Sequence, residues 1–217
     1  AIGGVVSATN SVGIGYRALY SNTSGSENTA VGFEAAKANT SGNDITAVGS
    51  RALYQNTSGS GNSGIGRIAL YSNTSGNYNT AVGKWGLFLN TTGDYNTSLG
   101  HGTLAAYSGS HTGDQNTAIG SRSMLYNISG SANTALGFES LQTNKGGNRS
   151  VAIGYKSMFY ANSASSAFTT ANTAVGYEAL KGSSTAANNT GTKNTAIGYQ
   201  SMQNNTCLLY TSPSPRD

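Results

Sequence analysis

One short pattern, Asn-Thr-Ala-Val-Gly at residues 28–32, returns along almost the whole chain and constrains what it can fold into. The glycines that close the pattern or its variants are separated by steps of 12, then 17 five times, then 20, 17, 17, 22 and 22 residues. A recurring period near 20 residues is typical of stacked repeat architectures. The closing glycines are Gly3, Gly15, Gly32, Gly49, Gly66, Gly83, Gly100, Gly120, Gly137, Gly154, Gly176 and Gly198.

Residues at fixed distances from these glycines form columns of constant character. Directly before the glycine lies an aliphatic residue, and four residues after it lies Leu or Met in all complete repeats but one. Thr-Ala-Val-Gly alternates as a short strand does, which puts Thr29 and Val31 on one face and Ala30 on the other. We predict that the aliphatic column and the Leu/Met column together fill a narrow interior. The predicted core residues are Val31, Val48, Ile65, Val82, Leu99, Ile119, Leu136, Ile153, Val175 and Ile197, with Leu53, Leu70, Leu87, Met124, Leu141, Met158 and Leu180.

The residue two before the glycine is always Ala, Gly or Ser, and it defines a small column. We predict that this column is a flat outward strip against which further copies of the chain pack. The strip consists of Ala30, Ala47, Gly64, Ala81, Ala118, Ala135, Ala152, Ala174 and Ala196.

These columns predict an all-β protein, a β-solenoid of about 11 or 12 rungs with a period of mostly 17 residues. The segment after the glycine, such as residues 17–20, is compatible with a second strand or with a one-turn helix. Residues 1–206 form one repeat array, which we expect to be a fragment truncated at both ends. Residues 207–217 break the repeat, contain both prolines, and resemble a translated sequencing-library adaptor, so we interpret them as a non-native tail.

The composition excludes several classes of function. Only 9% of residues are charged and the net charge of +4 is dispersed, so no basic face for nucleic acid is expected. No apolar stretch approaches the roughly 20 residues that cross a membrane. The only cysteine, Cys207, lies in the tail, which leaves no disulfide framework.

No group of residues indicates catalysis, and we predict that the chain is not an enzyme and has no cofactor. Residues 13–18 imitate a dinucleotide-binding fingerprint but lack its setting of strand, helix and acidic residue. His101 and His111 are the only histidines and have no partners at metal-ligand spacing. The acidic residues are scattered over different rungs, so they indicate no pair of catalytic carboxylates.

Two columns leave alternatives open. Aromatic residues recur one and five residues after the glycine, where they act either as a sugar-binding ladder or, as we favour, in packing. The Thr column suggests ice binding as a function. We place this function second because Thr29 shares its face of the strand with the predicted core. Asn28 and its equivalents are expected to cap turns.

The Asn-Ser/Thr-Ala-Val/Ile-Gly motif followed by Ala/Ser-Leu resembles the YadA-like head repeats of trimeric autotransporter adhesins. The variant that continues with Tyr-x-Ala-Leu resembles repeat arrays of phage and bacterial tail-fibre proteins. The resemblance covers nearly all of residues 1–206, although the family's short rung is about three residues shorter than the rung of this chain. It implies a left-handed β-roll, a homotrimer, and an extracellular or virion location with an adhesive or structural function.

The extra length of the longer rungs falls in residues 108–115, 161–171 and 182–193. Because insertions collect where the backbone is exposed, we expect these loops to bind a cell-surface glycan or a protein receptor. An ice-binding solenoid is the alternative function, and a carbohydrate-active tailspike-like enzyme is a more remote one. The loop residues expected to make contacts are Ser108, His111, Asp114, Phe168, Thr185 and Asn189.

Overall fold

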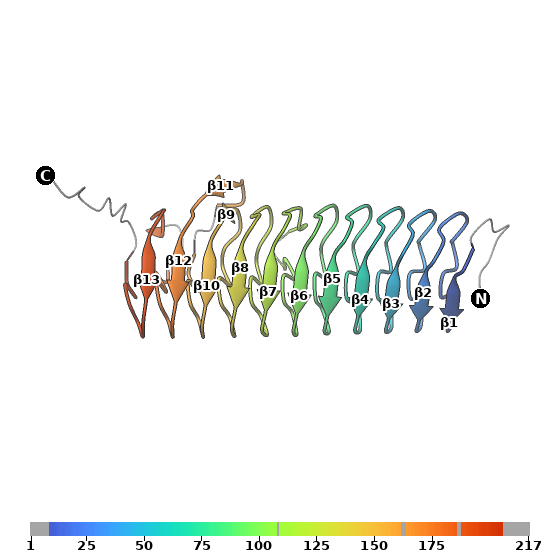
Figure 1. Ribbon diagram of the computed structural model, residues 1–217, viewed down its shortest axis with the longest axis horizontal. Helices are drawn as coiled ribbons and strands as arrows, with labels where there is room; N and C mark the ends of the chain where they lie inside the picture. The colour runs from blue at the N-terminus through green and yellow to red at the C-terminus, as the bar shows by residue number, and fades with distance from the viewer. Residues whose placement is uncertain (1–8, 108, 162–163, 186–187, 206–217) are drawn as a thin grey trace, which may run out of the picture.

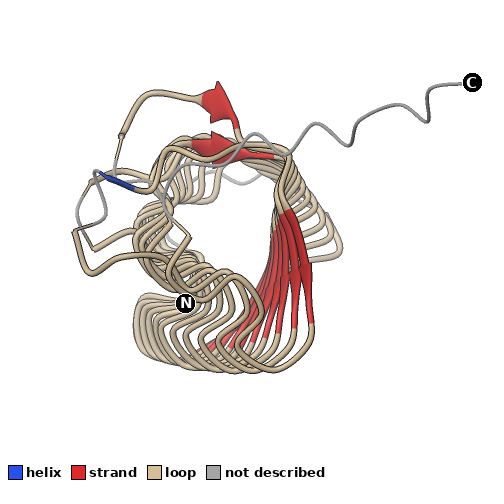
Figure 2. Ribbon diagram, turned by 90° about the vertical axis from the view of Figure 1, so that its left-hand side faces the viewer, coloured by secondary structure: helices blue, strands red, loops and turns tan. Residues whose placement is uncertain are grey.

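The computed structural model describes residues 9–107, 109–161, 164–185 and 188–205, which form one parallel β-solenoid with almost no helix (Figure 1). Each rung contributes one three-residue strand, and successive rungs stack side by side along the long axis. Viewed along that axis, the strands of the main sheet cover one side of the coil, and loops and turns form most of the rest (Figure 2). The repeat residues before Thr9, Ser108 and the proposed tail lie outside the described residues.

The main sheet has eleven parallel strands in chain order, apart from two short segments that pair elsewhere. The register joins like with like: Thr29 lies beside Thr46, Ala30 beside Ala47 and Val31 beside Val48. A second sheet pairs β9 (Gly147–Asn148) with β11 (Phe168–Thr169) beside the 161–171 insertion. The main strands are β1 (Val12–Ile14), β2 (Thr29–Val31), β3 (Thr46–Val48), β4 (Ser63–Ile65), β5 (Thr80–Val82), β6 (Thr97–Leu99), β7 (Thr117–Ile119), β8 (Thr134–Leu136), β10 (Val151–Ile153), β12 (Thr173–Val175) and β13 (Thr195–Ile197).

The strands face the opposite way from our prediction. The small column is buried inside the coil, and the Thr and aliphatic columns point outward. The proposed outward strip of Ala30, Ala47, Gly64, Ala81, Ala118, Ala135, Ala152, Ala174 and Ala196 is therefore wrong, because each of these residues is buried. The aliphatic half of the predicted core is wrong as well, since Val31, Val48, Ile65, Val82, Leu99, Ile119, Leu136, Ile153, Val175 and Ile197 are half-buried or exposed.

The interior is filled instead by the Leu/Met column packed on the small column. Leu53, Leu70, Leu87, Met124, Leu141, Met158 and Leu180 are all buried, as expected. The coil is so narrow that a Cβ on Gly64 would lie 3.3 Å from the carbonyl oxygen of Ala69 and 3.4 Å from Leu53. The strand residue that faces inward must therefore be small, because a longer side chain would collide with the opposite wall.

The segment after each glycine is neither a strand nor a helix. It forms turns in which alternate non-glycine residues have positive φ, as at Arg17 (52°) and Leu19 (53°). This conformation is unfavourable for residues with a Cβ, yet it recurs from rung to rung. Its amide groups bond to the next rung, for example Leu19 N–H to Ala35 O at 3.1 Å and Ala36 N–H to Ala52 O at 2.9 Å. The stacking of rungs therefore provides hydrogen-bond partners for the backbone groups that the turns leave unpaired.

The closing glycine of each rung is required by the same stacking. Gly32 has a φ of 139°, and a Cβ at this position would lie 2.5 Å from the carbonyl oxygen of Gly49 in the next rung. No other residue type fits this backbone at this approach, which explains why the glycine never varies.

A larger side chain in the small column should destabilise the coil. Ala47→Leu is expected to lower the free energy of unfolding by about 1–3 kcal/mol because it overfills a closed interior. Ser58→Leu, which enlarges an exposed residue of the turn, should change it by less than about 0.5 kcal/mol. Urea unfolding monitored by circular dichroism measures both. Equal stability of the two variants would contradict the inward orientation of Ala47.

Candidate functional site

Asparagine side chains line the inside of the turns and bond along the stack. In a first column, Nδ2 of Asn39, Asn56, Asn73, Asn90 and Asn144 donates to Oδ1 of the asparagine one rung earlier at 2.7–3.2 Å. The same Nδ2 also donates to the glycine carbonyl three residues ahead at 2.8–3.0 Å. The column therefore closes each Asn-Thr-Ser-Gly turn and joins it to its neighbour. Its members are Asn22, Asn39, Asn56, Asn73, Asn90, Asn127 and Asn144.

A second column lies directly before the strand in eight of the eleven rungs and was expected only to cap turns. Its Nδ2 groups donate to glycine carbonyls of the following rung at 2.7–2.9 Å. Except at Asn194, its Oδ1 atoms accept the backbone N–H of the corresponding residue one rung later at 2.8–3.1 Å. Both the Nδ2 and the Oδ1 atoms of this column therefore join one rung to the next. The members are Asn28, Asn62, Asn79, Asn96, Asn116, Asn133, Asn172 and Asn194.

His111 takes the place of an asparagine in the first column and is completely buried. Its Nδ1 lies 2.8 Å from Asn90 Oδ1, and its Nε2 lies 3.1 Å from Asn127 Nδ2. The neutral imidazole with its proton on Nδ1 satisfies both neighbours, since it donates to the carbonyl and accepts from the amide. Burial lowers the pKa of His111 to about 4. The proposal that His111 contacts a receptor is therefore wrong, because the side chain is part of the interior.

The other predicted loop residues are distributed over three rungs and form no common site. Asp114 is exposed, and its Oδ1 accepts the backbone N–H of Asp94 at 2.8 Å. Phe168 is half-buried in β11, and Thr185 is exposed. Asn189 is half-buried, and its Nδ2 donates to the carbonyls of Tyr160 and Ser183, so it anchors its own loop.

The outward face of the main sheet is the most regular surface of the coil. Its Thr and aliphatic columns run over all eleven strands, with Val12, Ser63 and Val151 as variants of the Thr column, and none of these positions is charged. Ile65 and Leu99 are 42% and 46% exposed. The alternating Thr and aliphatic residues already marked this face in the sequence. Recognising it as the outer face requires knowing which side of each strand points into the coil.

The aromatic columns stack on themselves along the coil. Phe138, Tyr155, Tyr177 and Tyr199 form a continuous series with ring centroids 5.1–5.6 Å apart and nearly parallel planes. Tyr54 and Tyr71 stack in the same way at 5.1 Å. Because each ring covers the face of its neighbour, the faces within a stack are not available to a sugar ring. The packing role that we favoured accounts for these columns.

Three glutamates of the turn segment are buried and paired with cations. Glu34 Oε1 lies 2.9 Å from Lys37 Nζ, and Glu34 Oε2 lies 2.9 Å from Arg51 Nε. Glu178 pairs with Lys181 at 2.7 Å. The hydrogen bond from the lysine is the main cause that lowers the pKa of Glu34 and of Glu178, against the opposing effect of burial. The carboxylates of Glu34 and Glu178 are therefore ionised and engaged within the coil, as a structural role requires.

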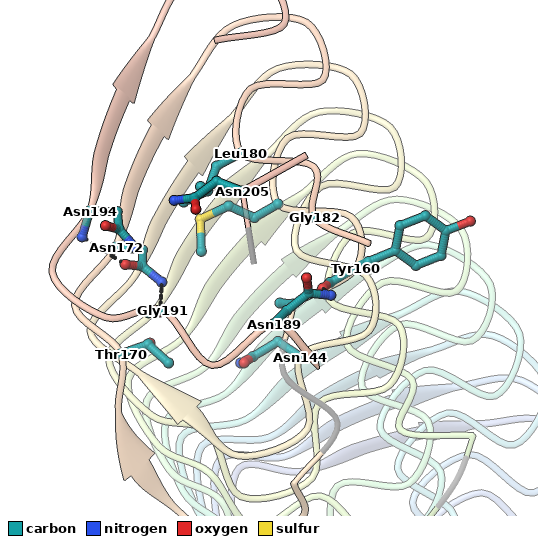
Figure 3. A pocket seen from close by; sticks show the side chains of 12 residues that line it. Asn144, Tyr160, Thr170, Asn172, Leu180, Gly182, Asn189, Gly191, Asn194 and Asn205 are labelled. Carbon is teal, nitrogen blue, oxygen red and sulfur yellow. Dashed lines mark hydrogen bonds between the residues drawn. The ribbon is translucent and has the colours of Figure 1, made fainter. Parts of the chain in front are cut away.

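A small hollow of about 30 Å³ lies inside the coil near its C-terminal end (Figure 3). Asn172 Nδ2 donates to Gly191 O there, and Asn172 Oδ1 accepts from Asn194 N, both at 2.8 Å. Asn194 Oδ1 has no hydrogen-bond partner within the described residues, although its counterparts accept from the following rung. The hollow has room for about one water molecule, so it offers no site for an organic ligand.

No group of three or more His, Cys, Asp or Glu side chains within the described ranges is arranged to hold a metal ion. His101 lies on the surface and His111 in the interior, so the two do not meet. In the part of the chain that the structure describes, no helix is long and apolar enough to span a membrane. No family model, curated protein or solved structure matches this chain.

The buried imidazole should make the coil sensitive to acid. The pKa of His111 is about 4 in the folded state against 6.5 in the unfolded state, so the unfolded chain binds the additional proton between these values. Stability is therefore full above pH ~6.5 and falls by about 3 kcal/mol as the pH drops towards ~4. Urea unfolding at a series of pH values measures this loss.

His111→Asn is the matched control because it restores an amide to the first asparagine column. The variant should lose the pH dependence between ~6.5 and ~4. The paired glutamates act at lower pH, since their pKa values are lowered from 4.5. An unchanged pH profile in His111→Asn would show that another group is responsible.

Proposed function

We propose that the chain is a non-enzymatic structural segment of an extracellular fibre or adhesin that assembles as a homotrimer through the outward face of its main sheet. The observation that carries this proposal is the uncharged Thr and aliphatic surface, which runs over eleven strands and is uncovered in the single chain. Contiguous exposed apolar surface of this kind marks interaction sites. The resemblance to adhesin and tail-fibre repeats supports the same function.

The size of the face is compatible with self-association. Eleven strands spaced by ~4.8 Å form a strip roughly 50 Å long and ~10 Å wide, or roughly 500 Å² in projection. A standard interface buries about 800 Å² per partner. The strip approaches that value when the neighbouring aromatic series, Phe138 to Tyr199, is added, and these rings are exposed as well.

In this proposal the coil is a rigid shaft and receptor contact belongs to the longer loops. The insertions at 108–115, 161–171 and 182–193 retain that role because they vary while the stacked body does not. Their contacting residues differ from our expectation at His111, which belongs to the interior.

Charge placed on the outward face should prevent assembly. The double variant Ile65→Lys and Leu99→Lys is expected to change the molar mass from three chains to one, since buried unpaired ammonium groups are strongly unfavourable. Light scattering coupled to size-exclusion chromatography measures the mass, and circular dichroism checks the fold.

Gln55→Lys with Ser58→Lys is the matched control, because both residues are exposed in the turn away from the sheet. It adds the same charge and should leave the trimer intact. A wild-type chain that is monomeric at micromolar concentration, or a trimer in the Ile65→Lys and Leu99→Lys variant, would refute this assembly.

Ice binding is the second candidate function, and the orientation of the Thr column favours it. Thr29, Thr80 and Thr97 are exposed on the flat sheet rather than facing the core. Rows of threonine and aliphatic side chains form a grid of about 4.8 Å by about 6.6 Å. A rigid lattice of methyl and hydroxyl groups is suited to holding ordered water.

Thermal hysteresis of the purified chain distinguishes this candidate. If the face binds ice, Thr80→Lys should abolish the hysteresis, while Ser58→Lys in the exposed turn should preserve it. Absence of hysteresis in the wild-type chain rejects ice binding. The trimer and the ice surface require the same face, so a stable trimer with its face covered also argues against this function.

A further inference from the structure

A hollow of about 440 Å³ lies among the turn segments of the coil near Trp85. Its volume lies within the range of small-molecule sites, about 300–1,000 Å³. Trp85, His101 and Tyr107 line it from two neighbouring rungs, and Arg122, Glu139 and Gln142 from the two rungs that follow.

The hollow exists because the repeat is broken twice in one rung. The position two residues after the closing glycine carries a long side chain in the neighbouring rungs, Trp85 and Arg122, but Gly102 between them has none. The position five residues after the closing glycine is aromatic at Phe88 and aliphatic at Leu125, but alanine at residue 105. In this rung the side chain is therefore absent at one of these positions and reduced to a methyl group at the other.

The same rung also carries an insertion that supplies Tyr107. Its ring lies 6.0 Å from Trp85 at an interplanar angle of 88°, so the two rings form a corner. Tyr107 is 42% exposed. His101 lies 5.2 Å from Trp85 on the neighbouring rung. An aromatic corner of this kind offers apolar contact to the C–H groups of a ligand.

The charges around the hollow are mainly positive. Arg122 is 54% exposed and uses one nitrogen, Nη1, to bond Glu139 Oε1 at 3.3 Å. Lys156 Nζ lies 3.6 Å from Glu139 Oε2, and Lys84 Nζ lies 4.2 Å from the centroid of Trp85. Arg122 and Lys156 thus both contact Glu139, and Lys84 adds a third positive charge beside Trp85, so the cations outnumber the carboxylate, which favours an anionic ligand. The other guanidinium nitrogens of Arg122 suit a carboxylate in particular.

We propose that this hollow binds an acidic sugar residue, a pyranose that carries a carboxylate, within a longer glycan. The aromatic corner packs on the C–H face of the ring, Arg122 binds the carboxylate, and the amide of Gln142 is placed for the hydroxyls. This site is a property of the single coil and does not depend on the trimer. Loss of the site would leave the proposed shaft function intact, and a monomeric chain would still bind.

Trp85 is the only tryptophan of the chain, so its fluorescence reports on the hollow directly. Titration with short oligogalacturonates should change the emission saturably at millimolar concentration or below. Neutral malto-oligosaccharides of the same length should bind at least tenfold more weakly. Absence of a saturable change, or equal affinity for the neutral series, would overturn the proposal.

Gly102→Gln tests the position of the site by filling the hollow. A Cβ at Gly102 meets only Leu125 at 3.7 Å and the Tyr107 hydroxyl at 4.0 Å, and the φ of 64° matches that of non-glycine residues in this column, such as Gln200 at 50°. The variant should therefore fold and lose binding at least tenfold. Arg17→Gln, in the same column at the other end of the coil, should bind as the wild type does. Undiminished binding by Gly102→Gln would place the ligand elsewhere.

Discussion

Close approach of identical rungs is the constraint on which the whole structure depends. The glycine at position 32 is held there because a Cβ would lie 2.5 Å from the carbonyl of Gly49. The asparagine amides form hydrogen bonds across this spacing, since side chains of the first column bond within their own turn and to a neighbouring rung, and those of the second column bond to the following rung. A buried amide that lost one partner would cost about 1–3 kcal/mol, so the rungs support one another only when they stack in register. The coil is thus stabilised by repetition more than by a large apolar core.

The architecture was predictable from the sequence, but the direction of its strands was not. Period, strand position and the inward Leu/Met column all follow from the spacing around the glycine. Ala30 and Val31 point to opposite faces of the strand whichever of them lies inside the coil. Hydrophobicity alone favours placing the larger residue, Val31, inside. The deciding quantity is the width of the interior, which depends on how residues 16–19 return across the coil. Their alternating positive φ has no sequence signal, because the residues at those positions include Arg, Glu and Leu.

The same limitation affected the interpretation of polar residues. Asn22 and Asn28 have the composition of surface turns, yet both are buried because their hydrogen bonds are satisfied by neighbouring rungs. His111 was assigned to an exposed loop because it lies in a longer rung. His111 aligns with the first asparagine column only if the inserted residues of its rung are placed before His111 and not after it. Counting from the glycine therefore locates the strand correctly and misplaces the residues beyond an insertion.

In a repetitive chain, departures from the repeat carry more information about function than the repeat itself. The outward face has almost no departures, which suits a contact with identical neighbours or with a lattice. The rung of Gly102 departs in two columns and also contains an insertion, and the only tryptophan lies one rung before it. Chance loss of a side chain would leave an apolar gap. Here the gap is bordered by an aromatic corner and by a guanidinium with nitrogens that remain exposed, and this combination of groups is what a specific ligand requires.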